Sequence, residues 1–208
     1  MDFSKKTGIS LSGEAHGIFF DLKDVGPVQL ATMSFGQRFT ITPLQMISSI
    51  SAIVNDGILM QPRIVKSITN TDTGELTTVP STAVRQVVSK TTSEDIKTMM
   101  QSEVEKGTGK RGAVTGYAIG GKTGTSEPNP SNPEEGYVAS FVGIGPVENT
   151  KAVILVCLYD PQGASHQGGQ IAAPVASNIF SEVLPYLGIA SNADKSSTEN
   201  KTSESNLY

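Results

Sequence analysis

Hydrophobic residues recur at helical spacing in three stretches of the chain, and this pattern predicts three helices. The first is expected over residues 43–55, where Thr42 precedes Pro43 as a helix cap. The second is expected in TTSEDIKTMMQSEVEKGTG and the third in APVASNIFSEVLPYL. The apolar face predicted for the second helix comprises Ile96, Met99, Met100 and Val104.

Elsewhere the pattern changes to short apolar runs that are bounded by turn residues, which predicts strands. QPRIVKSITN and ELTTVP flank the turn TDTG, and RQVVS is a further extended piece. YAIGGKTGTS predicts another strand, and YVASFVGIGP and AVILVCLYDP predict an antiparallel pair around VENTK. Helices and strands that are mixed in this way indicate the α+β class.

Composition excludes several kinds of site. The chain has 208 residues and a net charge of −4, which suits one globular domain without the basic patch typical of nucleic-acid binding. It has two histidines and one cysteine, so it offers no His/Cys metal cluster and no internal disulfide. We therefore expect no metal, no cofactor and no nucleic-acid partner, and we interpret Cys157 as a buried small apolar residue.

The two ends of the chain carry different signals. The N-terminus has no apolar segment of the kind found in signal peptides, and no run in the chain reaches the roughly 18–20 apolar residues that span a bilayer. Residues 190–208 are polar and poor in hydrophobic side chains, so we predict a disordered tail there. The folded part is then expected within residues 1–189.

The stretch GYAIGGKT at 116–123 fits the phosphate-binding pattern G-x-x-x-x-G-K-[ST]. That pattern holds phosphate only when a buried strand precedes it and a helix follows it directly, because the helix N-terminus supplies the N–H groups. Here Gly124, Pro128, Pro130 and Pro133 follow, which is incompatible with a helix that starts at Lys122. We therefore expect no nucleotide site.

In an extended segment, Lys122 and Gly124 point to one face, and Thr123 and Thr125 point to the other. Glycine in a strand often marks the close approach of another backbone or of a ligand. A strand edge with an ammonium and two hydroxyls suits a peptide-like ligand that bears a carboxylate, since the strand itself adds main-chain hydrogen bonds. On these four residues alone, an ordinary glycine-containing strand with a solvated Lys122 is an equally open alternative.

KTGT at 122–125 resembles the third signature, K-T-G, of the penicillin-binding transpeptidases and serine β-lactamases. The flanking sequence extends the resemblance to about residues 7–189. Six segments are similar, in order, to the C-terminal half of the transpeptidase domain of a class B penicillin-binding protein: GISLSGEAHG, ATMSFGQRFTITPLQM, IVNDGILMQPRIVKSI, VEKGTGKRGAVTGYAIGGKTGTSE, YVASFVGIGP and GGQIAAPVASNIFSEVLPYLGI. We accordingly interpret residues 1–189 as part of such a domain.

The resemblance implies an incomplete β-lactamase/transpeptidase-like α+β fold, with an antiparallel β-sheet of about five strands flanked by helices on both faces. Such enzymes acylate a serine with the D-Ala-D-Ala end of a peptidoglycan stem peptide and pass the acyl group to an amine, and β-lactams mimic the donor. Lys122 would have the catalytic role of supplying positive field. Thr123, Gly124 and Thr125 would bind substrate: the Thr125 hydroxyl the carboxylate, the Thr125 N–H the oxyanion, and Gly124 would let the acyl group lie against the strand.

The other two signatures of the family are absent from this sequence. No lysine has a serine three positions before it (S-x-x-K), and no asparagine has a serine two positions before it (S-x-N). In the family order both would lie upstream of residue 7, so we expect that the chain begins partway through the domain. An acyl-enzyme needs an activated nucleophile, so the missing N-terminal half of the domain is an expected partner, as are the stem peptide and β-lactams.

Three functional hypotheses follow. The chain is part of a peptidoglycan D,D-transpeptidase that is inactive alone, a truncated and non-catalytic binding module, or a fragment of a β-lactamase or β-lactam sensor. SLSGEAHG together with SFGQRFTITPLQM favours the first over the third. The family also implies a location at the outer face of the cell membrane, although this sequence shows no anchor of its own.

Overall fold

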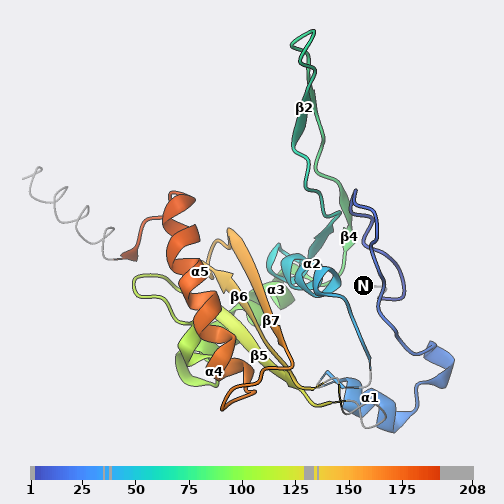
Figure 1. The fold of residues 1–208 in the computed structure, drawn as a ribbon, viewed down its shortest axis with the longest axis vertical. Coiled ribbons are helices and arrows are strands. Elements are labelled where there is room, and N and C mark those ends of the chain that lie inside the picture. The colour runs from blue at the N-terminus through green and yellow to red at the C-terminus, as the bar shows by residue number, and fades with distance from the viewer. Residues whose placement is uncertain (1–2, 35, 38, 129–133, 135, 193–208) are drawn as a thin grey trace, which may run out of the picture. The chain divides into compact units, whose positions relative to one another are not determined.

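The chain divides into two compact units, Met1–Ser93 and Glu94–Tyr208. The computed structural model describes residues 3–34, 36–37, 39–128, 134 and 136–192 (Figure 1). Most of the predicted polar tail, from residue 193 onward, lies outside the described residues. No helix among the residues described combines the length and the apolar character that a bilayer-spanning segment needs.

The first unit consists of short helices and two separate pairs of strands. β1 pairs with β4, and β2 pairs with β3, both antiparallel. The β2–β3 pair is the predicted hairpin around TDTG, and all six of its residues are exposed. The elements are the 3-10 helix Leu22–Asp24, α1 (Pro27–Met33), α2 (Pro43–Val54), β1 (Ile58–Met60), β2 (Ser67–Thr69), β3 (Leu76–Thr78) and β4 (Ala83–Gln86).

α2 confirms the first predicted helix and its cap. The Gln45 backbone N–H donates to Thr42 Oγ1 at 3.1 Å, and the Thr42 N–H donates to Gln45 Oε1 at 3.0 Å, which is a complete capping box. The Gln45 side chain is 2% exposed, and its Nε2 also donates to the carbonyl oxygens of Phe3 and Lys5 at 2.9 Å each. One residue therefore both caps the helix and holds the N-terminal segment against it.

The second unit is built on the antiparallel sheet β5-β6-β7. The central strand β6 is the most buried, and its Phe141 lies opposite Thr123 of β5 and Val156 of β7. The elements are α3 (Lys90–Lys106), which begins just before the boundary between the units, the 3-10 helix Lys110–Gly112, β5 (Gly120–Ser126), β6 (Val138–Gly145), β7 (Ala152–Tyr159), α4 (Gly168–Ile171) and α5 (Ala173–Tyr186).

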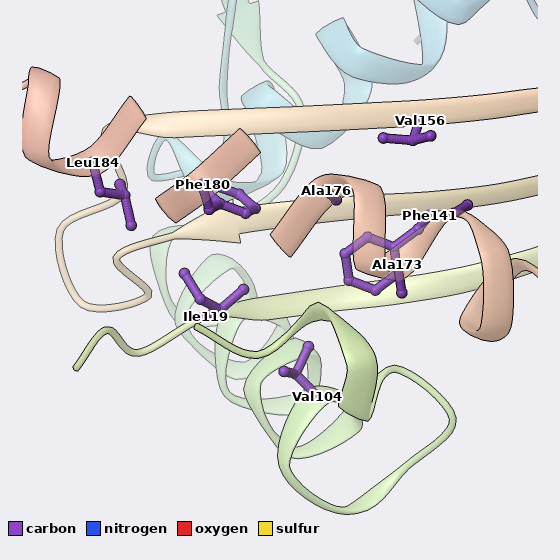
Figure 2. Close-up of a cluster of buried hydrophobic side chains, with 9 residues drawn as sticks. Val104, Ile119, Phe141, Val156, Ala173, Ala176, Phe180 and Leu184 are labelled. Atoms are coloured by element: carbon purple, nitrogen blue, oxygen red, sulfur yellow. The ribbon is translucent and has the colours of Figure 1, made fainter. Parts of the chain in front are cut away.

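The core of the second unit lies between α5 and one face of this sheet (Figure 2). Phe141 from β6 and Phe180 from α5 are at most 1% exposed, and Leu184 is fully buried. Gly121 leaves room for this packing, because a Cβ there would collide with the Phe141 ring. Met100 of α3 approaches the first residue of β5 from the opposite side. The expected α+β class and the antiparallel sheet with flanking helices are confirmed.

Several details differ from the sequence predictions. The described part of the main sheet has three strands, where about five were expected. Met99 is 67% exposed and does not belong to the apolar face of α3, whereas Met100 and Val104 are buried there. Cys157 is only half-buried, because it lies on β7 at the edge of the described sheet, yet burial still raises the pKa of its thiol.

Besides the two 3-10 helices, the elements that sequence reasoning missed are β1, α1 and α4. α1 begins after Gly26, which offers no side-chain cap, and it has no buried residue. Neither a side-chain cap nor apolar periodicity therefore predicts a helix there. α4 begins with two glycines, which have low helix propensity. Side-chain caps and apolar periodicity are therefore weak signals for α1, and helix propensity is a weak signal for α4.

Candidate functional site

The KTGT segment lies in β5, which is one of the two edge strands of the described sheet. β5 pairs with β6 over its whole length, from Gly120 opposite Ile144 to Ser126 opposite Val138. Its other side has no strand partner among the residues that the structure describes. An edge of this kind presents unpaired N–H and C=O groups to which an extended chain can add.

This arrangement contradicts a phosphate loop. Residues 120–126 form a strand, and Lys122 lies in its middle. No helix begins at Lys122, so the N–H groups that would hold a phosphate are not present in that geometry. The strand predicted from the glycine and proline pattern is confirmed.

Lys122 is exposed, and its ammonium lies along the strand. Nζ donates to the carbonyl oxygen of Thr123 at 2.8 Å. Within the described part of the chain, no ion pair of Lys122 with a carboxylate is found. The charge is therefore available to an anion that approaches the strand edge from solvent.

Thr125 contacts the start of α4. The backbone N–H of Gly168 donates to Thr125 Oγ1 at 3.2 Å. Gly168 is buried, and a Cβ at this position would collide with the carbonyl oxygens of Gly124 and Ser140. Only glycine lets α4 lie this close to β5 and β6. The close packing therefore requires glycine at position 168, the residue whose N–H contacts Thr125.

Thr123 contacts the loop that follows α3. Its Oγ1 lies 2.7 Å from Thr108 Oγ1, and Thr108 Oγ1 donates to Glu103 Oε1 at 2.6 Å. Gly169 of α4 packs on the methyl group of Thr123, since a Cβ there would lie 3.2 Å from Thr123 Cγ2. Thr123 thus contacts both the loop after α3 and the start of α4.

Gly124 has a neighbour that the sequence did not reveal. A Cβ at Gly124 would lie 2.6 Å from Ser140 Oγ on β6. The missing side chain therefore accommodates a serine of the adjacent strand. Whether it also makes room for a ligand stays a prediction.

An aromatic pair lies near the end of β5 in the same unit. Tyr137, the residue before β6, stacks on His166 with ring centroids 4.0 Å apart and an interplanar angle of 18°. His166 is two residues before Gly168. The stack therefore fixes the loop that leads into α4.

Sequence reasoning identified the strand residues of this site but missed the residues that hold them. Glu103, Thr108, Ser140 and Gly168 became visible only through contacts between distant segments. The only sequence signals for them were the glycines around Thr108 and the pair Gly168–Gly169. No serine nucleophile paired with a lysine three residues later exists in the sequence.

Comparisons with known proteins agree on one family. A family model described as "Penicillin binding protein transpeptidase domain" matches residues 1–181. Stage V sporulation protein D of Bacillus subtilis is 40% identical over 190 residues, which cover 90% of this chain and 29% of that protein. The probable peptidoglycan D,D-transpeptidase PenA of Neisseria gonorrhoeae is 28% identical, over 91% of this chain and 32% of that protein. The chain therefore spans about a third of the length of these curated relatives.

Solved structures give the same picture. Penicillin binding protein 3 from Mycobacterium tuberculosis in complex with aztreonam matches with a TM-score of 0.79 and 29% identity, over 91% of this chain and 45% of that one. The transpeptidase domain of Burkholderia pseudomallei penicillin-binding protein 3 matches with a TM-score of 0.77 and 33% identity, over 89% of this chain and 54% of that one. A further structure of the mycobacterial protein contains ampicillin.

Proposed function

The chain belongs to the penicillin-binding protein transpeptidase family, with class B penicillin-binding proteins among its relatives, and from this premise we propose that it forms the substrate-binding wall of a peptidoglycan D,D-transpeptidase. The observation that carries the proposal is the free edge of β5, with an exposed Lys122 and two threonines whose hydroxyls are held by neighbouring segments. The donor substrate is the D-Ala-D-Ala end of a stem peptide.

The binding step follows from the chemistry of the edge. An extended D-alanyl terminus adds to β5 through main-chain hydrogen bonds, as peptides do at other sheet edges. Its carboxylate is attracted by the Lys122 ammonium and accepts a hydrogen bond from the Thr125 hydroxyl. Charge-assisted bonds of this kind are roughly twice as strong as neutral ones, so the carboxylate makes the strongest contacts of the bound ligand.

The acylation step needs groups from both sides of the site. The N–H of Thr125 stabilises the oxyanion, a contribution typically worth about 10²–10³ in rate. The positive charge of the Lys122 ammonium lies near the reacting centre and stabilises negative charge there. This sequence contains no S-x-x-K signature, so we propose that this chain by itself binds substrate without forming an acyl-enzyme.

β-Lactams are proposed ligands of the same edge. Structures of the mycobacterial relative hold ampicillin and aztreonam. A β-lactam carries a carboxylate next to its reactive amide, so Lys122 and Thr125 recognise it as they recognise the donor. By family, the site works at the outer face of the cell membrane, where peptidoglycan is cross-linked.

The test is to separate reversible binding from acylation. The whole chain is incubated with ampicillin, its affinity is measured by calorimetry, and its intact mass is measured in parallel. We expect weak saturable binding and no covalent adduct. Lys122→Met should weaken binding about tenfold, which is the range for one hydrogen bond or ion pair to a charged group.

Lys151→Met is the matched control, because Lys151 is exposed in the turn between β6 and β7. It removes the same charge from the same unit, and we expect the affinity of the original chain. A covalent adduct would contradict the proposal that this chain contains no acylating nucleophile. Equal losses in the two variants would contradict a specific role of Lys122.

A further inference from the structure

Two cavities adjoin each other beside α2 in the first unit. The first has a volume of about 320 Å³ and lies between the N-terminal segment, α2 and the β1–β4 pair. The second has a volume of about 470 Å³ and lies between α2 and the residues around β1. Ser48, Met60 and Pro62 line both cavities, so the two together form one groove, which we call the α2 groove. Volumes of this size are typical of small-molecule sites.

The charged side chains that line the α2 groove are all basic. The first cavity is lined by Lys5, Lys6 and Arg85, and the second by Arg63. None of the described residues that line either cavity is acidic. The whole sequence has a net charge of −4, so a purely basic lining is not what its average composition would give. The groove therefore attracts an anion.

A β-bulge places a cation and an apolar side chain at the same cavity. Leu59 of β1 lies opposite Arg85 of β4. The next residue, Met60, lies opposite Ala83, so Val84 is an extra residue on β4. In a regular strand, successive residues point to opposite faces, and a bulge redirects one of them. Val84 and Arg85 accordingly both line the first cavity.

The apolar part of the lining continues from the first cavity into the second. Leu44 and Ile47 of α2 line the second cavity on one side, and Ile9 and Ile58 also line it. Only one of the four basic residues belongs to this cavity. The groove therefore has a basic end and a more apolar end.

Most of the uncharged polar side chains of the groove already have partners. Three side-chain amides donate to backbone carbonyls of the chain: Gln45 Nε2 at 2.9 Å, Gln61 Nε2 at 2.7 Å and Asn55 Nδ2 at 3.1 Å. The Thr7 hydroxyl donates at 2.6 Å to Glu14, a carboxylate that does not line the groove. A bound peptide would leave many of its own N–H and C=O groups unpaired here, which is costly. An alkyl chain has no such groups.

From this geometry we propose that the α2 groove binds a single-chain amphiphile, which is a linear alkyl chain with a carboxylate or phosphate head group. The head group lies beside Arg85 and Lys6 in the first cavity. The alkyl chain continues past Ser48 and Met60 into the second cavity. No residue of β5 lines the groove, so the inference does not depend on the proposed function.

Calorimetry on the whole chain with dodecyl phosphate, below its micelle concentration, tests the proposal. We expect saturable binding of one molecule. Each buried methylene should raise the affinity about fourfold, so hexyl phosphate and inorganic phosphate should bind far more weakly. Dodecyltrimethylammonium has the same chain with a cationic head, and we expect no saturable binding. Equal affinities of the two dodecyl compounds, or of inorganic and dodecyl phosphate, would overturn the proposal.

Dodecanoate distinguishes the two possible head groups. Saturable binding of dodecanoate or of dodecyl phosphate supports the proposal, and the tighter of the two identifies the preferred head group. A leucine-rich peptide with a free C-terminal carboxylate represents the other kind of occupant. Tighter binding of this peptide than of both dodecyl anions would assign the groove to a peptide and overturn the proposal.

Charge reversal in the groove gives the sharpest variant. Val84 is 54% exposed, so Val84→Asp adds a carboxylate to the first cavity without disturbing a core. We expect at least a tenfold loss of affinity for dodecyl phosphate and the appearance of dodecyltrimethylammonium binding. Ile68→Asp is the matched control, because Ile68 is 59% exposed on β2 and does not line the groove. Unchanged preference for the anion in Val84→Asp would contradict the proposed head-group site.

Removal of the cation provides a second, independent variant. Arg85→Met should weaken dodecyl phosphate binding about tenfold, which is the range for one hydrogen bond or ion pair to a charged group. Lys66→Met removes the same charge from an exposed position of the first unit outside the groove, and it should keep the original affinity. Thermal unfolding confirms that each variant is folded. Equal losses of affinity in the two variants would overturn the role of Arg85.

Discussion

The two units of the chain differ in how deeply the residues of their strands are buried. β6 of the second unit has six residues that are buried, with Phe141 and Ile144 at most 1% exposed. In the first unit, β2, β3 and β4 are exposed at every position, and β1 is half-buried. A strand that packs on both sides is held in one register, and the candidate site lies on such a sheet. The candidate site therefore lies in the unit whose central strand is the more deeply buried.

The largest expected effect is in the core of the second unit. Phe180→Ala removes a ring that packs between α5 and the sheet, and we expect the free energy of unfolding of that unit to fall by about 3–5 kcal/mol. Urea denaturation measures the change. Ile68→Ala in β2 is the contrast, because Ile68 is 59% exposed, and its effect should stay within about 0.5 kcal/mol. Similar losses of unfolding free energy for the two variants would contradict the claim that side-chain burial stabilises the second unit more than the β2–β3 hairpin.

A smaller effect is expected where α4 rests on the sheet. Gly168→Ala introduces a methyl group against the carbonyl oxygens of Gly124 and Ser140, so the backbone must shift at a cost of about 1–3 kcal/mol. Gly163→Ala is a control in the preceding loop, since a Cβ there meets no atom within 4 Å. Thermal unfolding compares the two variants. An unchanged transition for Gly168→Ala would show that α4 does not depend on this close approach.

In the first unit, stability is expected to depend on local hydrogen bonds more than on packing. Thr42→Ala removes the hydroxyl that accepts from the Gln45 N–H, and we expect a loss of about 1 kcal/mol. Amide hydrogen exchange along α2 reports this change directly. Thr42→Ser keeps the hydroxyl and should restore protection. Unchanged exchange in Thr42→Ala would mean that tertiary contacts, not the cap, hold the start of α2.

The smallest effect concerns the pH dependence of the N-terminal segment. The Thr7 hydroxyl donates to Glu14 Oε1 at 2.6 Å, and this bond, aided by the backbone N–H groups of Thr7 and Gly8, lowers the pKa of Glu14 from 4.5. A lowered pKa in the folded state stabilises the fold above the ordinary pKa, and this contribution is lost as the pH falls through the lowered value. NMR titration of the Glu14 carboxyl measures its midpoint.

Thr7→Val should move the Glu14 midpoint upward, because it removes the main cause of the shift. Thr73→Val, in the turn of the exposed hairpin, should leave it where it is. A midpoint that does not respond to Thr7→Val would show that the bond to the Thr7 hydroxyl does not hold the carboxylate.

The sequence alone was informative where the signal is local. The capping box of α2 follows from Thr42 and Gln45, and the strand containing Lys122 follows from glycines and prolines that exclude a helix. α4 could not be predicted, because its two initial glycines have low helix propensity. The reason for glycine at position 168 is the close contact with β5 and β6, which only the folded chain shows. Glu103 and Thr108 could not be assigned to the site either, because only the folded chain brings them to Thr123.

The claim that the β5 edge binds a carboxylate-bearing ligand is tested most directly by mapping ampicillin binding with NMR. The account predicts concentration-dependent shifts of the amide signals of Lys122, Thr123, Thr125 and Gly168, with the signals of the β2–β3 hairpin unchanged. Shifts that centre on the first unit, or the absence of any shift at saturating ampicillin, would contradict it.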